Sequence, residues 1–232
     1  MSDTQLHLPH LSKEFDLIFC KICNASTKEL IHPTTDQRFY RCEQCDFVFK
    51  SETHYLSTSD ELKEYDLHTN SVEDQNYVDY FKRFIDAAVG GYVTIGRKGL
   101  DFGSGPSPVL AEILERDYGY KMDIYDLFYA TEKVYQDRRY DLITSTEVVE
   151  HLADPLAFFK FARDHLNEDG LLAVMTLFHP EEDEAILKSH YLRDMTHISF
   201  FSLKTMETIA ALTGLEVVYT DHKRYTSFRR RT

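Results

Sequence analysis

The chain has 232 residues, of which 43% are hydrophobic, and a formal net charge of −13. This length suits one α/β domain with an appendage, and the hydrophobic share is enough for a buried core. No apolar run approaches the ~18 residues of a membrane span and no signal peptide is visible, so we expect a soluble, cytoplasmic protein without a membrane partner. The acidity is spread along the chain and argues against a nucleic-acid partner, which needs a basic footprint. Nothing in the sequence indicates an oligomeric state.

Two Cys-x-x-Cys pairs near the N-terminus contain all four cysteines, with 18 residues between the pairs. Each pair can form a tight turn whose two thiolates point the same way, and two such turns supply a tetrahedral zinc site. Two disulfides are the alternative, which a cytoplasmic compartment disfavours. A site with four thiolates is closed, so we expect structural Zn²⁺ in a ribbon-like module over residues 1–50. The expected ligands are Cys20, Cys23, Cys42 and Cys45.

Residues 51–95 are expected to form a helical bridge. An acidic helix is expected over 60–67 and a second helix over 71–89, where apolar side chains recur at helical spacing. The segment Tyr65–Asn70 between these helices is either a polar loop or a lid over a bound ligand.

Residues 96–232 alternate between short apolar segments and helical ones. Strands are expected at 99–103, 121–126, 141–146, 171–178, 215–220 and 225–231, and helices at 108–117, 155–166 and 203–213. This alternation implies an α/β fold with a doubly wound, mostly parallel sheet, closed by a hairpin of the last two strands. Such sheets bind ligands beyond the carboxyl ends of their strands.

A glycine-rich turn, Asp101-Phe102-Gly103-Ser104-Gly105, follows the first of these strands. Two glycines with one residue between them let the backbone turn sharply and approach a ligand closely, and the amides that begin the next helix point at it. The dinucleotide fingerprint needs a third small residue where this chain has Pro108, and no Gly-Lys-Ser/Thr phosphate-binding sequence follows. The turn therefore matches neither motif.

Two further segments follow strands of the same sheet. Asp126 ends the second strand, 21 residues after Gly105, where a carboxylate can bind a ribose diol. Asp123 is a weaker candidate because it lies in the middle of that strand. After the strand at 141–146 comes Glu147-Val148-Val149-Glu150-His151-Leu152.

In this order and spacing, the Asp-x-Gly-x-Gly turn, Asp126 and the Glu147–Leu152 segment resemble the class I S-adenosylmethionine-dependent methyltransferases, including the ubiquinone-biosynthesis O-methyltransferases. The resemblance covers roughly residues 96–220. It implies a Rossmann-like sheet of the seven-stranded type and S-adenosylmethionine as cofactor, with S-adenosylhomocysteine as product. The residues that it implies for cofactor binding are Asp101, Gly103, Ser104, Gly105, Asp126, Leu127, Thr146, Glu147 and His151.

The chain departs from this family between Asp126 and the strand at 141–146. The 14 residues 127–140 leave room for one short strand, expected at 133–135, and provide no acid at its end for the adenine. Apolar contacts from Leu127 and Phe128 are expected instead. The turn at 167–170 also matches the family only at Gly170.

The segment 178–201 lies where such a domain places its active-site loops. If the acceptor must lose a proton, His190 and His197 are the expected bases, because imidazole titrates near neutral pH. Arg193 can clamp an anionic group, or it pairs with Asp194. Another alternative is a second metal bound by three histidines, His179, His190 and His197. The expected substrate contacts are Tyr65, His68, Tyr191 and Arg193.

The favoured function is transfer of a methyl group to an O, N or C nucleophile of a small molecule. A set of uncharacterised bacterial methyltransferases is similar over nearly the whole chain, and sugar C-methyltransferases are similar in joining an N-terminal zinc module to such a domain. One alternative is an rRNA or tRNA methyltransferase whose zinc ribbon contacts RNA. The other is a non-catalytic protein that binds S-adenosylmethionine. The acidity opposes the first alternative, and the intact motifs oppose the second.

Overall fold

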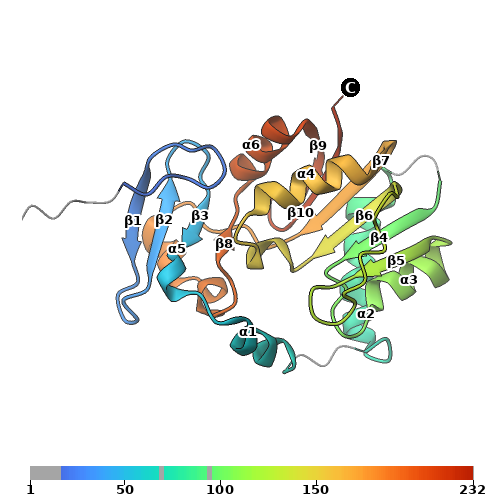
Figure 1. Ribbon diagram of the computed structural model, residues 1–232, viewed down its shortest axis with the longest axis horizontal. Helices are drawn as coiled ribbons and strands as arrows, with labels where there is room; N and C mark the ends of the chain where they lie inside the picture. The colour runs from blue at the N-terminus through green and yellow to red at the C-terminus, as the bar shows by residue number, and fades with distance from the viewer. Residues whose placement is uncertain (1–16, 68–70, 93–95, 232) are drawn as a thin grey trace, which may run out of the picture.

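The structure is a computed structural model that describes residues 17–67, 71–92 and 96–231. Two β-sheets dominate it (Figure 1), a large one of six strands and a small one of four. Within the described ranges, no helix has the length and apolar character needed to cross a membrane.

The large sheet has the strand order β5-β4-β6-β7-β10-β9. Strands β5, β4, β6 and β7 are parallel, and β10 is antiparallel to both β7 and β9. The expected doubly wound, mostly parallel sheet with a closing hairpin is thus confirmed. The strands are β4 (Lys98–Phe102), β5 (Lys121–Tyr125), β6 (Tyr140–Thr146), β7 (Leu166–Met175), β9 (Leu215–Thr220) and β10 (Tyr225–Arg230).

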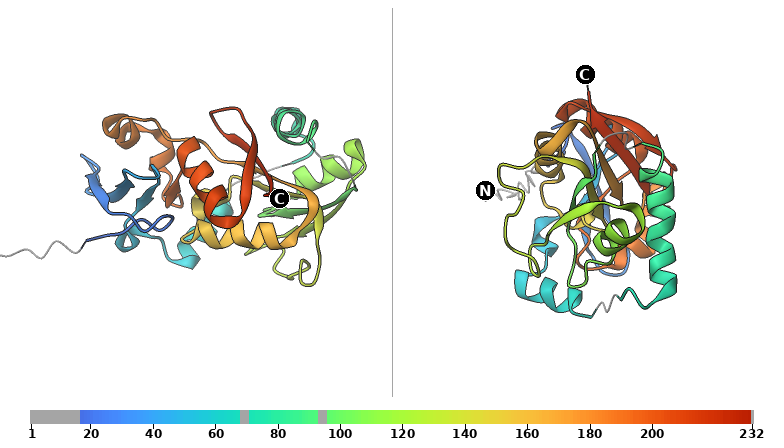
Figure 2. Two further views of the ribbon diagram at one scale, coloured as in Figure 1. Left: turned by 90° about the horizontal axis from the view of Figure 1, so that it is seen from above. Right: turned by 90° about the vertical axis from the view of Figure 1, so that its right-hand side faces the viewer.

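Helices cover both faces of this sheet (Figure 2). Neighbouring strand residues point to opposite faces, so Leu142 packs in the core with α2 and α3, whereas Ile143 packs in the core with α4 and α6. The helices are α2 (Gln75–Phe84), its π-helical continuation η2 (Ile85–Val89), α3 (Val109–Tyr118), α4 (Pro155–His165) and α6 (Leu203–Thr213). Local sequence sets their ends, since Asp154 and Ser202 cap the starts of α4 and α6, and Gly119 and Gly214 end α3 and α6 in the left-handed conformation.

Three sequence expectations about these elements were wrong. Residues 127–139 form turns instead of containing a strand at 133–135, because Tyr135 turns inward and packs on Tyr125 and Phe161. The large sheet therefore has six strands among the described residues. Strand β7 begins at Leu166, so residues 167–170 form a bulge in the strand rather than a turn before it. Helix α2 begins at Gln75, capped by Asp74, rather than at residue 71.

The small sheet has the order β1-β2-β3-β8, with all neighbours antiparallel. Its first three strands come from the cysteine-containing segment, but β8 comes from the segment 178–201. A shared core contains the cysteines together with side chains of α4 and α6. The boundaries 1–50, 51–95 and 96–232 therefore stay a prediction, since the first and last parts share a sheet. The strands are β1 (Thr27–Ile31), β2 (Arg38–Cys42), β3 (Val48–Lys50) and β8 (Ser199–Phe200).

Short helices connect the two sheets. Helix α1 (Thr58–Tyr65) runs below the space between them in Figure 1, and Ser57 caps its start. The remaining short helices are η1 (Glu52–His54), η3 (Val149–His151), α5 (Asp183–Lys188) and η4 (His190–Arg193).

Candidate active site

A cavity of about 820 Å³ lies at the carboxyl ends of β4, β5 and β6. The loops that follow these three strands line it, together with side chains from α1 and α2 and from the segment 194–197. Ligands of doubly wound folds bind at this edge, where the strand order reverses. The cavity is lined by all nine residues expected to bind the cofactor, which are Asp101, Gly103, Ser104, Gly105, Asp126, Leu127, Thr146, Glu147 and His151.

The glycine turn after β4 lies directly against the loop after β6. Gly103 has φ +85°, and a Cβ atom there would overlap the side chain of Val148. The amides of Gly103 and Ser104 donate to the carbonyl of Tyr125 at 2.7 and 3.2 Å. Only glycine combines this conformation with this contact, so the turn needs Gly103 for steric reasons.

Asp126 joins the loops after β4 and β5. Its Oδ2 accepts a hydrogen bond from the Gly105 amide at 2.9 Å, and its Oδ1 accepts from the amides of Phe128 and Tyr129 at 2.8 and 3.0 Å. Asp123, the weaker candidate, is bound to Arg138 and to the Tyr140 hydroxyl, both at 2.8 Å, and does not line the cavity.

Asp101 is buried at the base of the turn, with 2% of its surface exposed. The Thr144 hydroxyl donates to its Oδ1 at 2.8 Å. Burial raises the pKa of Asp101 to about 7, against the lowering effect of the Thr144 hydrogen bond. The carboxyl therefore titrates near neutral pH.

Two glutamates of the loop after β6 share a hydrogen-bonding partner. Glu147, at φ +53°, accepts hydrogen bonds from the hydroxyls of Tyr80 at 2.8 Å and Tyr191 at 3.1 Å. The Tyr191 hydroxyl also contacts Oε1 of Glu150, whose side chain is fully buried. Burial, and then the nearby Glu147, raise the pKa of Glu150 well above its usual value. Oε2 of Glu150 has no hydrogen-bond partner among the described atoms.

His151 and His197 lie side by side at the cavity wall, with ring centroids 4.8 Å apart. Nδ1 of His151 lies 3.1 Å from the carbonyl oxygen of Thr196, and Nδ1 of His197 lies 2.8 Å from that of Tyr191. Burial lowers the pKa of His197, partly offset by Asp194, whose Oδ2 lies 3.6 Å from Nε2.

A family model described as a methyltransferase domain matches residues 54–220. The chain belongs to this methyltransferase family. Its sheet and cavity are those of a class I S-adenosylmethionine-dependent methyltransferase, and S-adenosylmethionine is the methyl donor that the family implies.

Solved structures share the fold of this methyltransferase at low sequence identity. An O-methyltransferase family protein from Burkholderia thailandensis is 12% identical with a TM-score of 0.53, over 81% of this chain and 78% of that one. An O-methyltransferase family 2 protein from Planctomyces limnophilus, solved with apigenin, is 17% identical with a TM-score of 0.52, over 65% of this chain. The likeness covers 57% of the Planctomyces chain and 60% of the mitomycin 7-O-methyltransferase MmcR. A comparison with curated proteins found no match.

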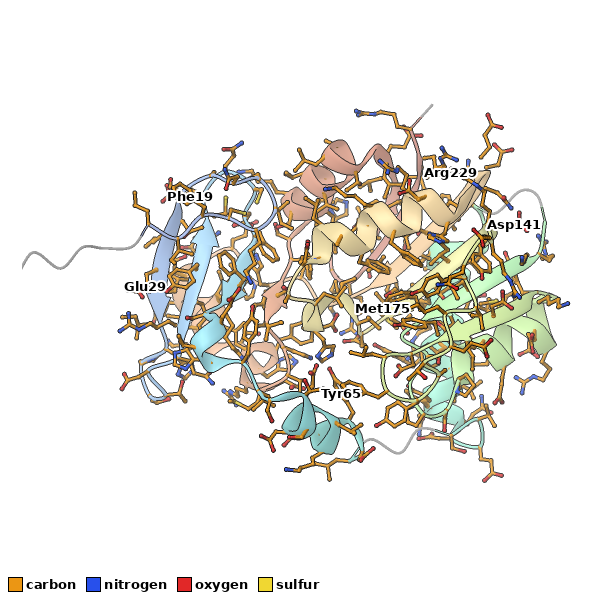
Figure 3. All side chains as sticks on the ribbon, viewed as in Figure 1. Phe19, Glu29, Tyr65, Asp141, Met175 and Arg229 are labelled. Carbon is orange, nitrogen blue, oxygen red and sulfur yellow. The ribbon has the colours of Figure 1, made fainter. Side chains whose placement is uncertain are left out.

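Of the residues expected to contact the substrate or act as bases, some line the cavity and others do not. Tyr65 and His197 line the cavity, and Figure 3 shows Tyr65 where α1 approaches the large sheet. His190 and Arg193 are exposed on η4 and do not line it. Tyr191 is buried, and its hydroxyl reaches the two glutamates rather than the cavity. The remaining candidate, His68, lies outside the described residues.

Two alternatives for the segment 178–201 are wrong. Asp194 does not pair with the exposed Arg193, because Oδ1 of Asp194 accepts hydrogen bonds from the amide and hydroxyl of Thr196 at 2.9 and 2.6 Å. The metal site of three histidines does not form either, since the two ring nitrogens of His179 contact the carbonyl oxygens of Pro180 and Asp46. Among the described residues, the groups able to hold a metal are the four cysteines and Glu150, His151 and His197.

The sequence analysis missed several lining residues. Tyr77, Tyr80 and Phe81 reach the cavity from one side of α2. The helical spacing had indicated a core position for Phe81, and the two tyrosines had been assigned no role. Glu150 was part of the motif but was given no role. Its only sequence signal was its place beside His151.

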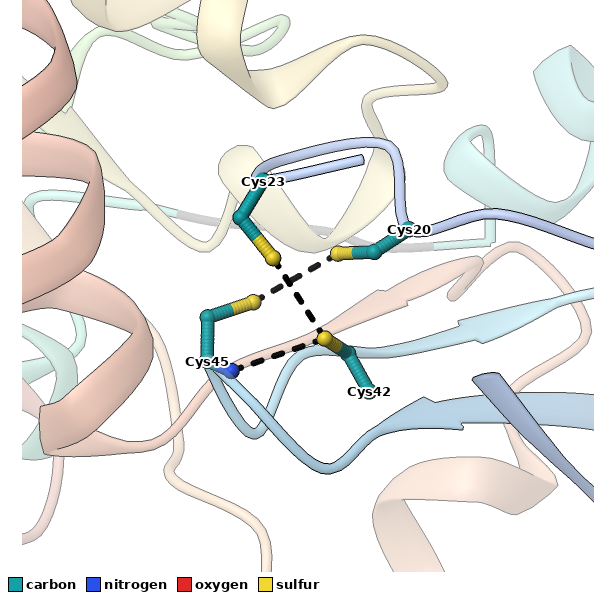
Figure 4. Close-up of side chains that lie close together, drawn as sticks. All are labelled: Cys20, Cys23, Cys42 and Cys45. Carbon is teal, nitrogen blue, oxygen red and sulfur yellow. Dashed lines mark hydrogen bonds between the residues drawn. The ribbon is translucent and has the colours of Figure 1, made fainter. Parts of the chain in front are cut away.

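The four cysteines, of which only Cys42 lies on a strand of the small sheet, form one cluster (Figure 4). Sγ of Cys20 lies 3.4 Å from that of Cys45, and Sγ of Cys23 lies 3.5 Å from that of Cys42. A disulfide requires ~2.05 Å, whereas four sulfurs around zinc at ~2.3 Å lie ~3.8 Å apart. The amides of Ile22 and Cys45 donate to Cys20 and Cys42 at 3.3 and 3.5 Å. The donors and their spacing fit a zinc ion.

Proposed function

We propose that this methyltransferase transfers the methyl group of S-adenosylmethionine to a small-molecule acceptor that shares the cavity with it. The supporting observation is that the glycine turn, Asp126 and the Glu147–His151 segment converge on one cavity. Its volume of about 820 Å³ lies within the ~300–1,000 Å³ typical of small-molecule sites.

The cofactor is proposed to bind across the loops after β4 and β5. Gly103 and Gly105 give the methionine part close access to the backbone, and Asp101 supplies a carboxyl group there. The Asp126 carboxylate has roughly four acceptor positions, and three are occupied by backbone amides, so one remains on Oδ2 for a ribose hydroxyl. Leu127 and Phe128 are proposed to contact the adenine.

The acceptor is proposed to bind between Tyr65 and the segment 194–197. The described lining residues include five acids and neither lysine nor arginine. This charge favours the cationic sulfonium and opposes a polyanionic acceptor such as RNA. Methyl transfer needs mainly alignment and exclusion of water. Where the acceptor must lose a proton, His197 offers its Nε2, because Nδ1 donates to the Tyr191 carbonyl.

We also propose that the four cysteines hold structural Zn²⁺. The small sheet is too small to be stable by its own core, and a bound metal supplies part of the folding free energy of such modules. Four thiolates leave no open position for substrate, so this ion stabilises the fold without taking part in the reaction.

The variant Asp126→Asn tests the proposed cofactor site. An amide cannot accept as many hydrogen bonds as the carboxylate, and a hydrogen bond to a charged group contributes roughly 1.5–3 kcal/mol. We expect the dissociation constant for S-adenosylmethionine to rise roughly 10- to 100-fold in calorimetry. Asp123→Asn is the matched control, because Asp123 lies on β5, three residues before Asp126, but outside the cavity. Equal affinity of Asp126→Asn and the parent protein would show that the cofactor binds elsewhere.

The raised pKa of Asp101 predicts that the affinity for the cofactor depends on pH. A pKa of about 7 means that the carboxyl is mostly protonated at pH 6 and mostly ionised at pH 8. The ionised form attracts a cationic ligand, so we expect affinity for S-adenosylmethionine to increase as pH rises from 6 to 7.5, by up to about tenfold. Asp101→Asn should flatten this profile in calorimetry at matched pH values. A parent profile that falls over this range would contradict the assignment.

A further inference from the structure

We propose that Glu150, His151 and His197 form a binding site for a divalent transition-metal ion at the acceptor side of the cavity. This site is separate from the four cysteines. It deepens the proposed function and rests on it for its role, but the binding of the ion can be measured without any methyl transfer.

The three side chains come from two segments that hydrogen bonds hold together. Glu150 and His151 belong to η3 after β6, and His197 follows η4. The amide of Ile198 donates to the carbonyl of Glu150 at 2.8 Å, which fixes His197 beside η3. One carboxylate oxygen and one nitrogen of each histidine lie within 4.8 Å of one another. Ligands around a tetrahedral ion are ~3.4 Å apart at bonds of ~2.1 Å, so side-chain shifts of about 1 Å complete the site.

Both imidazole rings are oriented as in metal-binding histidines. Nδ1 of His151 and Nδ1 of His197 each face a backbone carbonyl oxygen, at 3.1 and 2.8 Å. A carbonyl only accepts hydrogen bonds, so Nδ1 carries the proton in each neutral ring and Nε2 carries a lone pair. Metal-ligating histidines are usually fixed by such a bond from their other nitrogen.

The third group is a buried carboxyl with one unsatisfied oxygen. Glu150 is fully buried, its Oε1 contacts the Tyr191 hydroxyl, and its Oε2 has no hydrogen-bond partner among the described atoms. Leaving a buried polar atom unpaired is costly, and a cation at this point would satisfy it. Glu147 and Asp194 line the adjacent cavity and add negative charge. The positive charge of the buried Lys50 acts in the opposite sense and lowers the pKa of His197.

The donor set indicates the class of ion. Two imidazole nitrogens and one carboxylate oxygen suit first-row divalent metals such as Mn²⁺, Co²⁺ or Zn²⁺ rather than Ca²⁺, which prefers six to eight oxygens. Three protein ligands leave positions open. His151 and His197 line the cavity, so the open positions are accessible from the acceptor side.

This site gives the proposed reaction a preference for oxygen acceptors. A bound divalent cation lowers the pKa of a hydroxyl group that ligates it, and the hydroxyl proton passes to water. The oxygen then forms its bond to the methyl carbon while the carbon–sulfur bond breaks and its electron pair stays on sulfur. The products are the methyl ether and S-adenosylhomocysteine. His197 would then act as a metal ligand rather than as the base.

Mn²⁺ binding to the full chain tests the site. The protein is first loaded with one equivalent of Zn²⁺, because thiolates retain zinc in preference to manganese, and free Mn²⁺ is then followed by electron paramagnetic resonance. We expect one Mn²⁺ per chain in the parent protein and a loss of affinity of at least ~10-fold in Glu150→Gln and His197→Ala. His222→Asn, in the exposed turn between β9 and β10, should bind Mn²⁺ like the parent, and zinc content should be equal in all four proteins.

Calorimetry with S-adenosylmethionine separates this proposal from the proposed function. Variants that bind the cofactor normally are folded, so their loss of Mn²⁺ is a loss of ligands. The metal site is overturned if the parent binds the cofactor but neither Mn²⁺ nor Co²⁺ beyond its zinc, or if Glu150→Gln binds Mn²⁺ as tightly as the parent. A parent that binds Mn²⁺ but no S-adenosylmethionine supports the metal site and contradicts the proposed function.

Discussion

Gly103→Val is expected to abolish measurable binding of S-adenosylmethionine while the protein remains folded. The Cβ atom alone would overlap the side chain of Val148, and φ +85° disfavours every residue with a Cβ. The larger side chain also enters the space proposed for the methionine part of the cofactor. Gly103→Ala introduces the same overlap with Val148 but lacks the larger side chain of valine. We expect it to weaken binding of S-adenosylmethionine by roughly 10- to 100-fold, which corresponds to backbone strain of about 1–3 kcal/mol. Calorimetry measures both affinities.

Two further variants separate the overlap from the conformational strain. Gly119 also has a left-handed conformation, at φ +70°, but open space surrounds its Cβ position and it does not line the cavity. Gly119→Ala should therefore lower thermal stability with no change in cofactor affinity. The double variant Gly103→Ala/Val148→Ala removes the methyl groups of Val148 that would overlap the new Cβ atom at position 103. Part of the affinity for S-adenosylmethionine should therefore return. Retained affinity in Gly103→Val would refute the placement of the cofactor.

The residues that the family resemblance implied for cofactor binding do line one cavity. The glycine turn, Asp126 and Glu147 each lie immediately after a strand, and parallel strands bring such positions to one edge. Only the alternation of strands and helices was needed to place them together. The positions of these residues at one cavity were therefore accessible from the sequence, whereas their roles in cofactor binding stay a prediction.

The acceptor side depends on long-range packing, which the sequence does not show. His190 and His197 looked equivalent as candidate bases, but the short helix η4 exposes His190, whereas a hydrogen bond to the Tyr191 carbonyl turns His197 inward. Strand β8 has only two residues and gave no periodic signal, so its pairing with β3 was missed. The unsatisfied oxygen of Glu150 likewise becomes visible only in three dimensions.

The pairing of β8 with β3 connects the cysteine cluster to the acceptor side. The carbonyl of Ile198 accepts a hydrogen bond from the Lys50 amide at 2.9 Å, and the amide of Ile198 donates to the backbone carbonyl of Glu150 at 2.8 Å. The buried Lys50 ammonium donates to the carbonyl of Met195 at 3.0 Å. On the α6 side, the Thr205 hydroxyl donates to the Cys45 carbonyl at 2.9 Å. The segment that carries His197 is thus held between the small sheet and η3, and its position depends on the small sheet being folded.

Cys42→Ser is therefore expected to release zinc, destabilise the small sheet and reduce methyl transfer, although Cys42 does not line the cavity. Serine is a poor zinc ligand, and structural zinc in small modules contributes on the order of 10 kcal/mol of folding free energy. We expect zinc content to fall from one equivalent to a trace in elemental analysis, and amides of β1, β2, β3 and β8 to lose protection in hydrogen exchange. Cofactor affinity should change much less, because the loops after β4 and β5 do not contribute to the small sheet.

Chelation of the parent protein supplies the matched control for Cys42→Ser. If the loss of zinc causes the destabilisation, a strong chelator should lower the stability of the parent to that of Cys42→Ser. Added Zn²⁺ should then restore the stability of the parent but not that of Cys42→Ser. A thiol reductant should then have no effect, because the sulfurs are 3.4–3.5 Å apart and unbonded. Destabilisation by reductant but not by chelator would instead show two disulfides. Full zinc content in Cys42→Ser would remove Cys42 from the ligand set, and unchanged exchange in β8 would show that the small sheet does not position His197.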